Sequence, residues 1–111
     1  MKPLVKLVIY TPVSHADEIR QVLGEAGAGN IGNYDFCSFS TRGIGRFRGN
    51  EKSNPAIGKP GEIEEVEEER IETICYKEDA AQILADVKAV HPYEEPAMDV
   101  YALEDQKALK D

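Results

Sequence analysis

A chain of 111 residues, 41% hydrophobic and 31% charged, is long enough to bury one core, and we predict a single domain over residues 1–111. No apolar run is long enough to cross a bilayer, and a net charge of −8 disfavours binding to nucleic acid or to a membrane surface. Residues 1–6 lack the apolar block of a signal peptide, so we expect a cytoplasmic protein. Cys37 and Cys75 are too few for a disulfide scaffold and are expected to be buried thiols.

The first part of the chain predicts a strand, a helix and a second strand. Residues 4–10 are almost all apolar, which is typical of a strand covered on both faces. Ser14 can cap a helix whose apolar residues recur at helical spacing as far as residue 26, and Gly27 can end it. Alternation from residue 34 to 41 predicts the next strand.

The second part repeats this order after a long connection. Residues 43–61 contain five glycines and two prolines, which predicts a mobile loop. A strand is expected from residue 66 to 75, a helix from residue 78 or 79 to 90, and a last strand over 97–103. Residues 104–111 are expected to be a polar tail that frays.

The predicted order β-α-β-β-α-β is that of a ferredoxin-like α+β sandwich, an antiparallel sheet with two helices on one face and a core within residues 4–103. The other face would be bare. Apolar residues such as Phe36, Ile74 and Tyr101 cannot all point at the helices, and in a short chain a second subunit usually covers such a face. We therefore expect a homo-oligomer, with a cyclic trimer as the first hypothesis.

Five sequence blocks occur in order along the chain: Gly27–Asp35, Cys37–Thr41, Asn54–Gly58, Glu64–Glu68 and His91–Ala97. Together they resemble the PII/CutA-like domain inserted in the middle of many bacterial NIF-three-like proteins, the NGG-interacting-factor-three family. The resemblance covers about residues 4–103 and implies the fold of the CutA and PII proteins, which are ferredoxin-like trimers. The dimetal site of NIF-three-like proteins lies in two flanking lobes, so the resemblance transfers no metal ligand to this chain. It implies a stand-alone insert domain that senses or binds rather than catalyses.

The segment from His91 to Pro96 contains an imidazole, a phenol and two carboxylates within six residues. The proline after His91 cannot continue a helix and favours a rigid, extended connection. His91, Glu94 and Glu95 could ligate a divalent metal ion such as zinc or copper. Alternatively, His91 caps the preceding helix, Tyr93 packs, and the glutamates meet solvent or a neighbouring subunit. The residues leave both interpretations open.

Residues 42–61 contain five basic side chains and one acidic one, within a chain that is acidic overall. Guanidinium groups and glycine backbone N–H groups suit a phosphate or carboxylate anion. The alternative is a solvated loop whose arginines pair with the glutamates that follow. The run of six glutamates between residues 62 and 69 is expected to form a solvated face. The candidate ligand-binding residues are Arg42, Arg46, Arg48, His91, Tyr93 and Glu94.

The leading functional hypothesis is a non-enzymatic, oligomeric PII/CutA-like domain. It would bind a small ligand or a partner in a cleft between subunits, formed by residues 42–61 and 91–96. A divalent metal-binding protein of the CutA type and an accessory subunit of a NIF-three-like hydrolase are the alternatives. Ser38, Ser40 and Cys37 could be proposed as nucleophiles, but none has a histidine close to it in sequence, so an enzyme is the less favoured interpretation.

Overall fold

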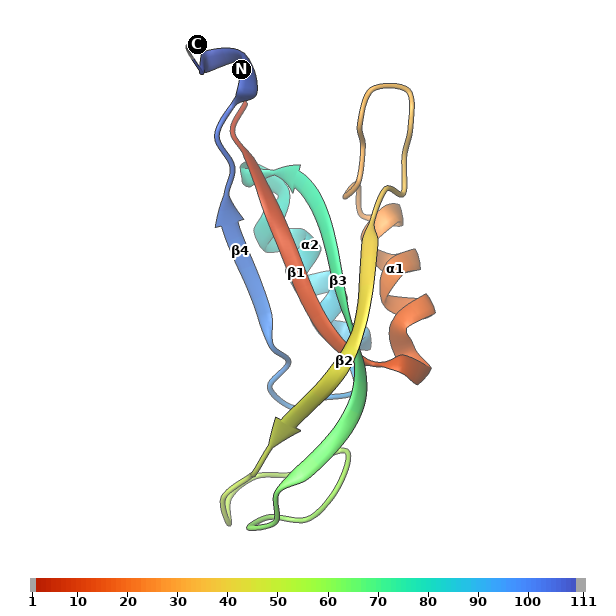
Figure 1. Ribbon diagram of the computed structural model, residues 1–111, viewed down its shortest axis with the longest axis vertical. Helices are drawn as coiled ribbons and strands as arrows, with labels where there is room; N and C mark the ends of the chain where they lie inside the picture. The colour runs from red at the N-terminus through yellow and green to blue at the C-terminus, as the bar shows by residue number, and fades with distance from the viewer. Residues whose placement is uncertain (1, 110–111) are drawn as a thin grey trace.

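The computed structural model describes residues 2–109 and contains four strands and two helices in the predicted order (Figure 1). A single-turn 3₁₀ helix, η1, precedes the first helix and another, η2, follows the last strand. Residues 110 and 111 of the expected polar tail lie outside the described part. The elements are β1 (Leu4–Pro12), η1 (Val13–His15), α1 (Ala16–Glu25), β2 (Phe39–Phe47), β3 (Glu64–Tyr76), α2 (Lys77–Val90), β4 (Met98–Ala102) and η2 (Gln106–Ala108).

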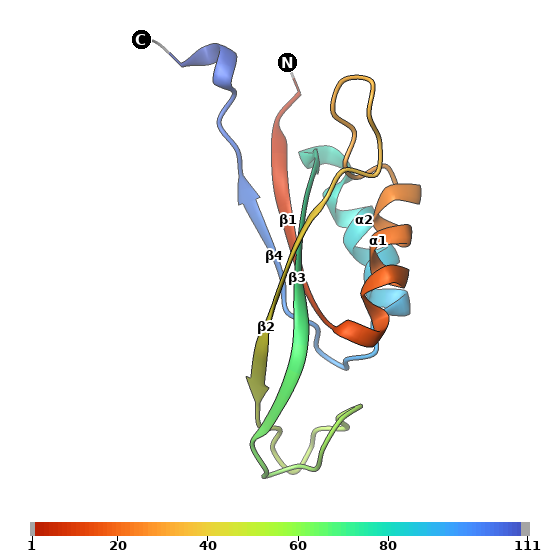
Figure 2. The same ribbon diagram turned by 45° about the vertical axis from the view of Figure 1, so that its right-hand side comes forward.

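The four strands form one sheet in the order β2-β3-β1-β4, and every neighbouring pair is antiparallel. Both helices lie on the same face of this sheet (Figure 2). The ferredoxin-like sandwich predicted from the order of the elements is therefore confirmed. β2 and β3 continue beyond the helices as a two-stranded ribbon, which carries the long connection between them (Figures 1 and 2).

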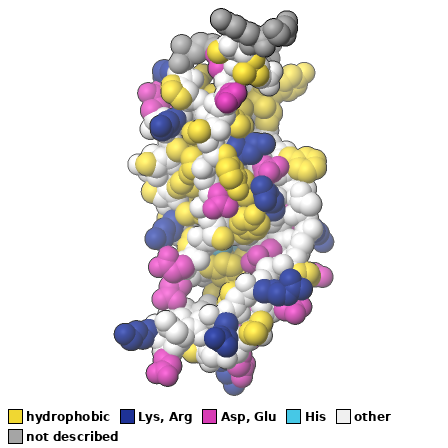
Figure 3. Space-filling model, turned by 60° about the vertical axis from the view of Figure 1, so that its left-hand side comes forward, with side chains coloured by type: hydrophobic (Ala, Val, Ile, Leu, Met, Phe, Trp, Pro, Cys, Tyr) yellow, Lys and Arg dark blue, Asp and Glu magenta, His cyan; other side chains and the backbone are white. Residues whose placement is uncertain are grey.

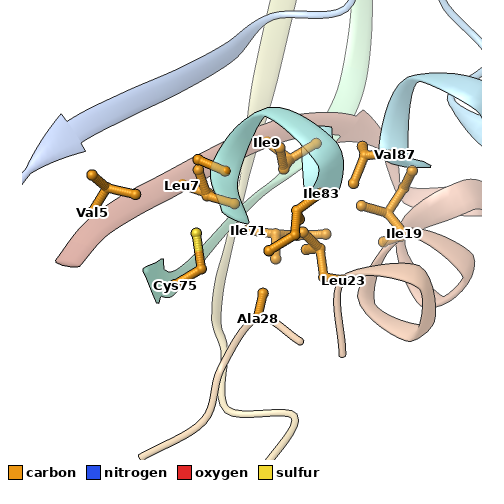
Figure 4. Close-up of a cluster of buried hydrophobic side chains, with 12 residues drawn as sticks. Val5, Leu7, Ile9, Ile19, Leu23, Ala28, Ile71, Cys75, Ile83 and Val87 are labelled. Carbon is orange, nitrogen blue, oxygen red and sulfur yellow. The ribbon is translucent and has the colours of Figure 1, made fainter. Parts of the chain in front are cut away.

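The core fills the space between the sheet and the helices (Figure 4). Its side chains alternate along the strands and recur at helical spacing in α1 and α2. Burying each of these large side chains contributes roughly 1.5–3 kcal/mol. β1 is an inner strand, and Val8 on its other face is also fully buried, which agrees with the expected strand covered on both faces. The largest core residues are Leu7 and Ile9 of β1, Ile71 of β3, Ile19 of α1, and Ile83 and Val87 of α2.

Three predicted element boundaries are wrong, and each error has a local cause. The strand expected from residue 34 begins only at Phe39, because the backbone at Phe36 turns through the left-handed region (φ 55°) and breaks the extended run. The loop expected from residue 43 begins only after Phe47, since Gly43–Phe47 pair with β3. Ser14 does not cap α1; its hydroxyl lies 2.9 Å from Nδ1 of His15, which itself occupies the cap position.

Two expectations about burial also need correction. Phe36 does not lie on the bare face of the sheet: its ring lies against Gly24 of α1, where an added Cβ would meet the ring at 2.0 Å. Of the two cysteines, Cys75 is buried as expected, whereas Cys37 is only partly buried.

The face of the sheet opposite the helices is partly uncovered. Strand register places Phe39, Tyr76 and Tyr101 on this face, and each is between 46% and 67% exposed. Figure 3 shows hydrophobic side chains running down this side of the molecule, interrupted by charged ones. Within residues 2–109, no helix has the length and apolar character needed to cross a membrane.

Candidate functional site

A cavity of about 670 Å³ lies where the β2–β3 ribbon, the loop after β2 and the turn before β4 meet. Of its five sheet residues, Tyr10, Gly45, Phe47 and Glu68 belong by register to the face opposite the helices, and Arg46 belongs to the other face. The cavity therefore joins the two segments that the sequence singled out, residues 42–61 and 91–96. Of the candidate residues, Arg46, Arg48, Tyr93, Glu94 and Glu95 line it.

Aromatic side chains form one wall of the cavity. The rings of Phe47 and Tyr93 meet edge to face with their centroids 5.6 Å apart, and Tyr10 also lines the cavity. These rings come from β2, from the turn before β4 and from β1, so three distant parts of the chain build the wall.

His91 supports the turn from behind the cavity and is buried. Its Nε2 lies 2.7 Å from the carbonyl oxygen of Tyr10, and its Nδ1 accepts a 3.1 Å hydrogen bond from the backbone N–H of Tyr93. A carbonyl can only accept and an N–H can only donate, so the imidazole is neutral with its proton on Nε2. Burial lowers the pKa of His91, and the bond to the Tyr10 carbonyl only partly opposes this.

This geometry bears on both interpretations of His91. Its backbone N–H bonds to the carbonyl of Val87, so His91 does stand at the end of α2, but its side chain reaches across to β1 instead of capping the helix. Both ring nitrogens are occupied, and residues 2–109 contain no group of three His, Cys, Asp or Glu side chains that could hold a metal ion. The structure does not bring His91, Glu94 and Glu95 together as a metal site.

Tyr93 binds a buried carboxylate. Its hydroxyl donates a 2.7 Å hydrogen bond to Oε2 of Glu68, which is only 9% exposed. Burial of the phenol and the neighbouring Glu68 carboxylate together raise the pKa of Tyr93 well above its ordinary value. Tyr93 therefore remains a neutral donor at every physiological pH, and it holds Glu68 at the cavity wall.

Glu94 ties the turn to the long loop. Its Oε2 accepts a 2.9 Å hydrogen bond from the backbone N–H of Asn54, forty residues away in sequence. Glu95 is exposed at the rim of the same cavity. This hydrogen bond links the turn to the loop beside the cavity.

The cations of the cavity differ in how they are engaged. Arg46 makes an exposed ion pair with Glu65, with 3.4 Å between Nε and Oε1. Among residues 2–109, the ion pairs involve neither Arg48 nor Lys52, and both line the cavity. Arg42 lies outside it, in a smaller neighbouring cavity of about 260 Å³ that shares Tyr10, Gly45 and Glu68 with the first.

The glutamate run is a solvated face only in part. Glu68 and Glu69 are buried, contrary to the sequence-based expectation. Glu69 accepts a 2.5 Å bond from Arg20 of α1, and Arg20 also binds Asp17 and Ser40. This cluster links α1 to β2 and β3. Removing one partner of a largely buried ion pair would leave the other charge unpaired, which destabilises the fold.

Among the residues that sequence reasoning missed are Tyr10, Phe47 and Glu68, which line the cavity, and Asn54, whose backbone N–H binds Glu94. Strand alternation could have placed Glu68 on the same face as Arg70, opposite Ile71. No local signal marks the pairing of Glu68 with Tyr93, because twenty-five residues separate them.

No family model matches the chain. It is, however, 49% identical over 100 residues to a protein of Halalkalibacterium halodurans named a GTP cyclohydrolase 1 type 2 homolog; the match covers 90% of this chain and 27% of the relative. It also superimposes on a Bacillus cereus protein related to NIF3, with a TM-score of 0.78 and 42% identity over 94% of this chain and 26% of the other. The chain is similar to one segment of NIF3-related proteins. It spans about a quarter of the length of these relatives.

A third comparison concerns the fold of the chain. The periplasmic divalent cation tolerance protein CutA of Archaeoglobus fulgidus superimposes with a TM-score of 0.64 at 22% identity, over 96% of this chain and 88% of the other. At that identity the likeness establishes the fold alone. The resemblance to an insert domain with a CutA-like fold is confirmed.

Proposed function

We propose that this protein is a non-enzymatic, oligomeric binding domain whose ligand is a small anion held in the 670 Å³ cavity. The observation that carries the proposal is the meeting of the cationic loop and the aromatic turn in one hollow, although forty residues separate Asn54 from Glu94. A concave site with apolar walls and a few placed polar groups is the usual form of a small-molecule site.

The charges favour an anion over a cation. Arg48 and Lys52 have no ion-pair partner within residues 2–109, so their charges are available to a ligand. By contrast, Glu68 and Glu94 already accept hydrogen bonds, from the Tyr93 hydroxyl and the Asn54 backbone. The aromatic wall would receive an apolar or planar part of the same molecule.

The uncovered sheet face supports the oligomer, with a trimer as the arrangement we propose. The cavity and the exposed Phe39, Tyr76 and Tyr101 lie on the same face, opposite the helices. A second copy covering that face would bury these side chains and also approach the cavity. β2 and β4 are the edge strands of the sheet and offer backbone groups for the same contact.

The side chains present favour binding over catalysis. His91 has both ring nitrogens engaged by backbone groups, which removes it as a general base. Ser14 and His15 lie within hydrogen-bonding distance of each other, but they sit at the exposed start of α1 and line neither cavity described above.

Binding should depend on Arg48. The test is calorimetric titration of the protein with inorganic phosphate, di- and tricarboxylates and nucleotides. The anion that binds best is then titrated into the variants. Arg48→Ala should weaken binding about tenfold, because a charge-assisted hydrogen bond contributes roughly 1.5–3 kcal/mol.

Lys59→Ala is the matched control, since Lys59 is an exposed cation of the same loop that does not line the cavity. It should leave affinity unchanged. Equal losses in both variants would mean that the ligand responds only to the net charge of the loop. Absence of saturable binding by any of these anions would refute the proposed function.

A further inference from the structure

An apolar turn projects from the opposite end of the molecule, between α1 and β2. Ile31 is 51% exposed and Tyr34 is 75% exposed, and they face each other across the turn. The backbone N–H of each donates a 2.9 Å hydrogen bond to the carbonyl of the other. We call residues 31–34 the apolar turn.

The apolar turn is held in place rather than loose. At its base, Gly29 donates a 2.7 Å hydrogen bond to the carbonyl of Ile74 and accepts one from the N–H of Cys37. The Thr73 hydroxyl donates to the Cys37 carbonyl at 2.7 Å. Phe36 adopts a left-handed φ of 55° that costs a non-glycine residue of order 1 kcal/mol, and its ring packs on α1. The backbone strain at Phe36 and these hydrogen bonds therefore accompany a fixed conformation of the exposed apolar side chains.

A groove of about 910 Å³ adjoins the apolar turn. It is lined by Gly27 and residues 30–32, by the residues entering β1, by the end of β3 and by the residues leaving β4, including Leu4, Tyr76 and Lys107. The N–H of Leu103 donates a 3.1 Å bond to the carbonyl of Leu4, so the chain enters and leaves the domain side by side (Figure 1). The apolar turn and both connections therefore share one end of the molecule.

The relatives indicate what covers this end. About three quarters of the length of the NIF3-related proteins lies outside the part that matches this chain. In those proteins the remaining polypeptide must connect through the ends of the matched part, and these lie beside the groove. Tethering gives it a high local concentration, so a modest apolar contact is enough to dock it.

We infer that the apolar turn and its groove are the docking surface for the part of a NIF3-related protein that lies outside the matched segment. The recognised partner surface is apolar, with a recess for Ile31 and a hydrogen-bond acceptor for the Tyr34 hydroxyl. Lysines and acids both line the groove, so the contact is not defined by net charge. The inference is independent of the ligand of the 670 Å³ cavity.

The test is site-specific photo-crosslinking in the cell that makes the protein. Tyr34→p-benzoylphenylalanine places a photoreactive group on the apolar turn, and the same change at Gln82, on the exposed side of α2, is the control. After irradiation, mass spectrometry of the digested product identifies the crosslinked peptides.

We expect the Tyr34 probe to crosslink to NIF3-related sequence outside the matched segment, in the same or a separate polypeptide, and the Gln82 probe to give no such product. Adding Ile31→Ser to the Tyr34 probe should lower the yield about tenfold, because it removes an apolar anchor that docking would bury. Crosslinks only to another copy of this domain, to an unrelated protein, or to nothing would overturn the inference. An unchanged yield with Ile31→Ser would overturn the role of the apolar turn.

Discussion

Gly29→Ala is expected to destabilise the protein by about 3 kcal/mol or more. Gly29 has a left-handed φ of 85°, and a Cβ there would lie 2.5 Å from the carbonyl oxygen and 2.6 Å from the nitrogen of Cys37. Because both obstructing atoms are backbone, the segment that carries the apolar turn must move. Equilibrium unfolding in guanidinium chloride measures the loss.

Gly27→Ala is the control that separates the steric effect of the added Cβ from the effect of the left-handed backbone conformation. Gly27 also has a left-handed φ, of 102°, but an added Cβ would meet nothing within 4 Å. Gly27→Ala should therefore lower the free energy of unfolding only by the cost of a left-handed φ in a non-glycine residue, about 1 kcal/mol. Equal losses for the two variants would show that contact between Gly29 and Cys37 does not hold this segment.

His91→Ala is expected to cost about 3 kcal/mol in the free energy of unfolding. It removes a buried side chain and leaves the carbonyl of Tyr10 and the N–H of Tyr93 without the partners that the imidazole provides. Since these bonds position the turn that carries Tyr93 and Glu94, anion binding should weaken as well. His15→Ala is the control, because within residues 2–109 the His15 side chain hydrogen-bonds only to the neighbouring Ser14 hydroxyl, and it should change stability by less than about 0.5 kcal/mol.

The same histidine should make stability depend on pH. The pKa of folded His91 is lowered, whereas the unfolded side chain titrates near the ordinary value of about 6.5. Below that pH the unfolded state binds the proton more readily, so wild-type stability falls as pH falls, by at most about 1.4 kcal/mol per pH unit. The stability difference between wild type and His91→Ala should therefore shrink between about pH 7.5 and 5.5. A constant or growing difference would contradict the buried, neutral imidazole.

The order of the elements could be predicted because it depends on periodicity along the chain. The continuous apolar run of β1 and the helical spacing of α1 and α2 are local patterns, and they led to the observed sheet and core. The boundaries around β2 could not be predicted in this way. Residues 34–38 alternate like a strand, but the bonds of Gly29 and Thr73 to Cys37 hold them in another path. Gly43 and Gly45 suggest a loop, but thirteen-residue β3 offers them a pairing partner.

The candidate site was predicted as two segments, and only the fold shows how they meet. Arg46, Arg48, Tyr93 and Glu94 line the same cavity, while Arg42 lies in the neighbouring one. The role of His91 was not predictable, because its partner is the carbonyl of Tyr10, eighty-one residues away. The burial of acids 68 and 69 likewise depends on distant partners in the turn and in α1.

Native mass spectrometry of protein purified without chelators tests the central claim most directly, since one spectrum gives both the number of subunits and the mass of any retained ligand. We predict an assembly of three chains of 12.3 kDa each, carrying a small anion that Arg48→Ala loses and Lys59→Ala keeps. A monomer without added mass, unchanged on addition of the anions in the panel, would contradict the account.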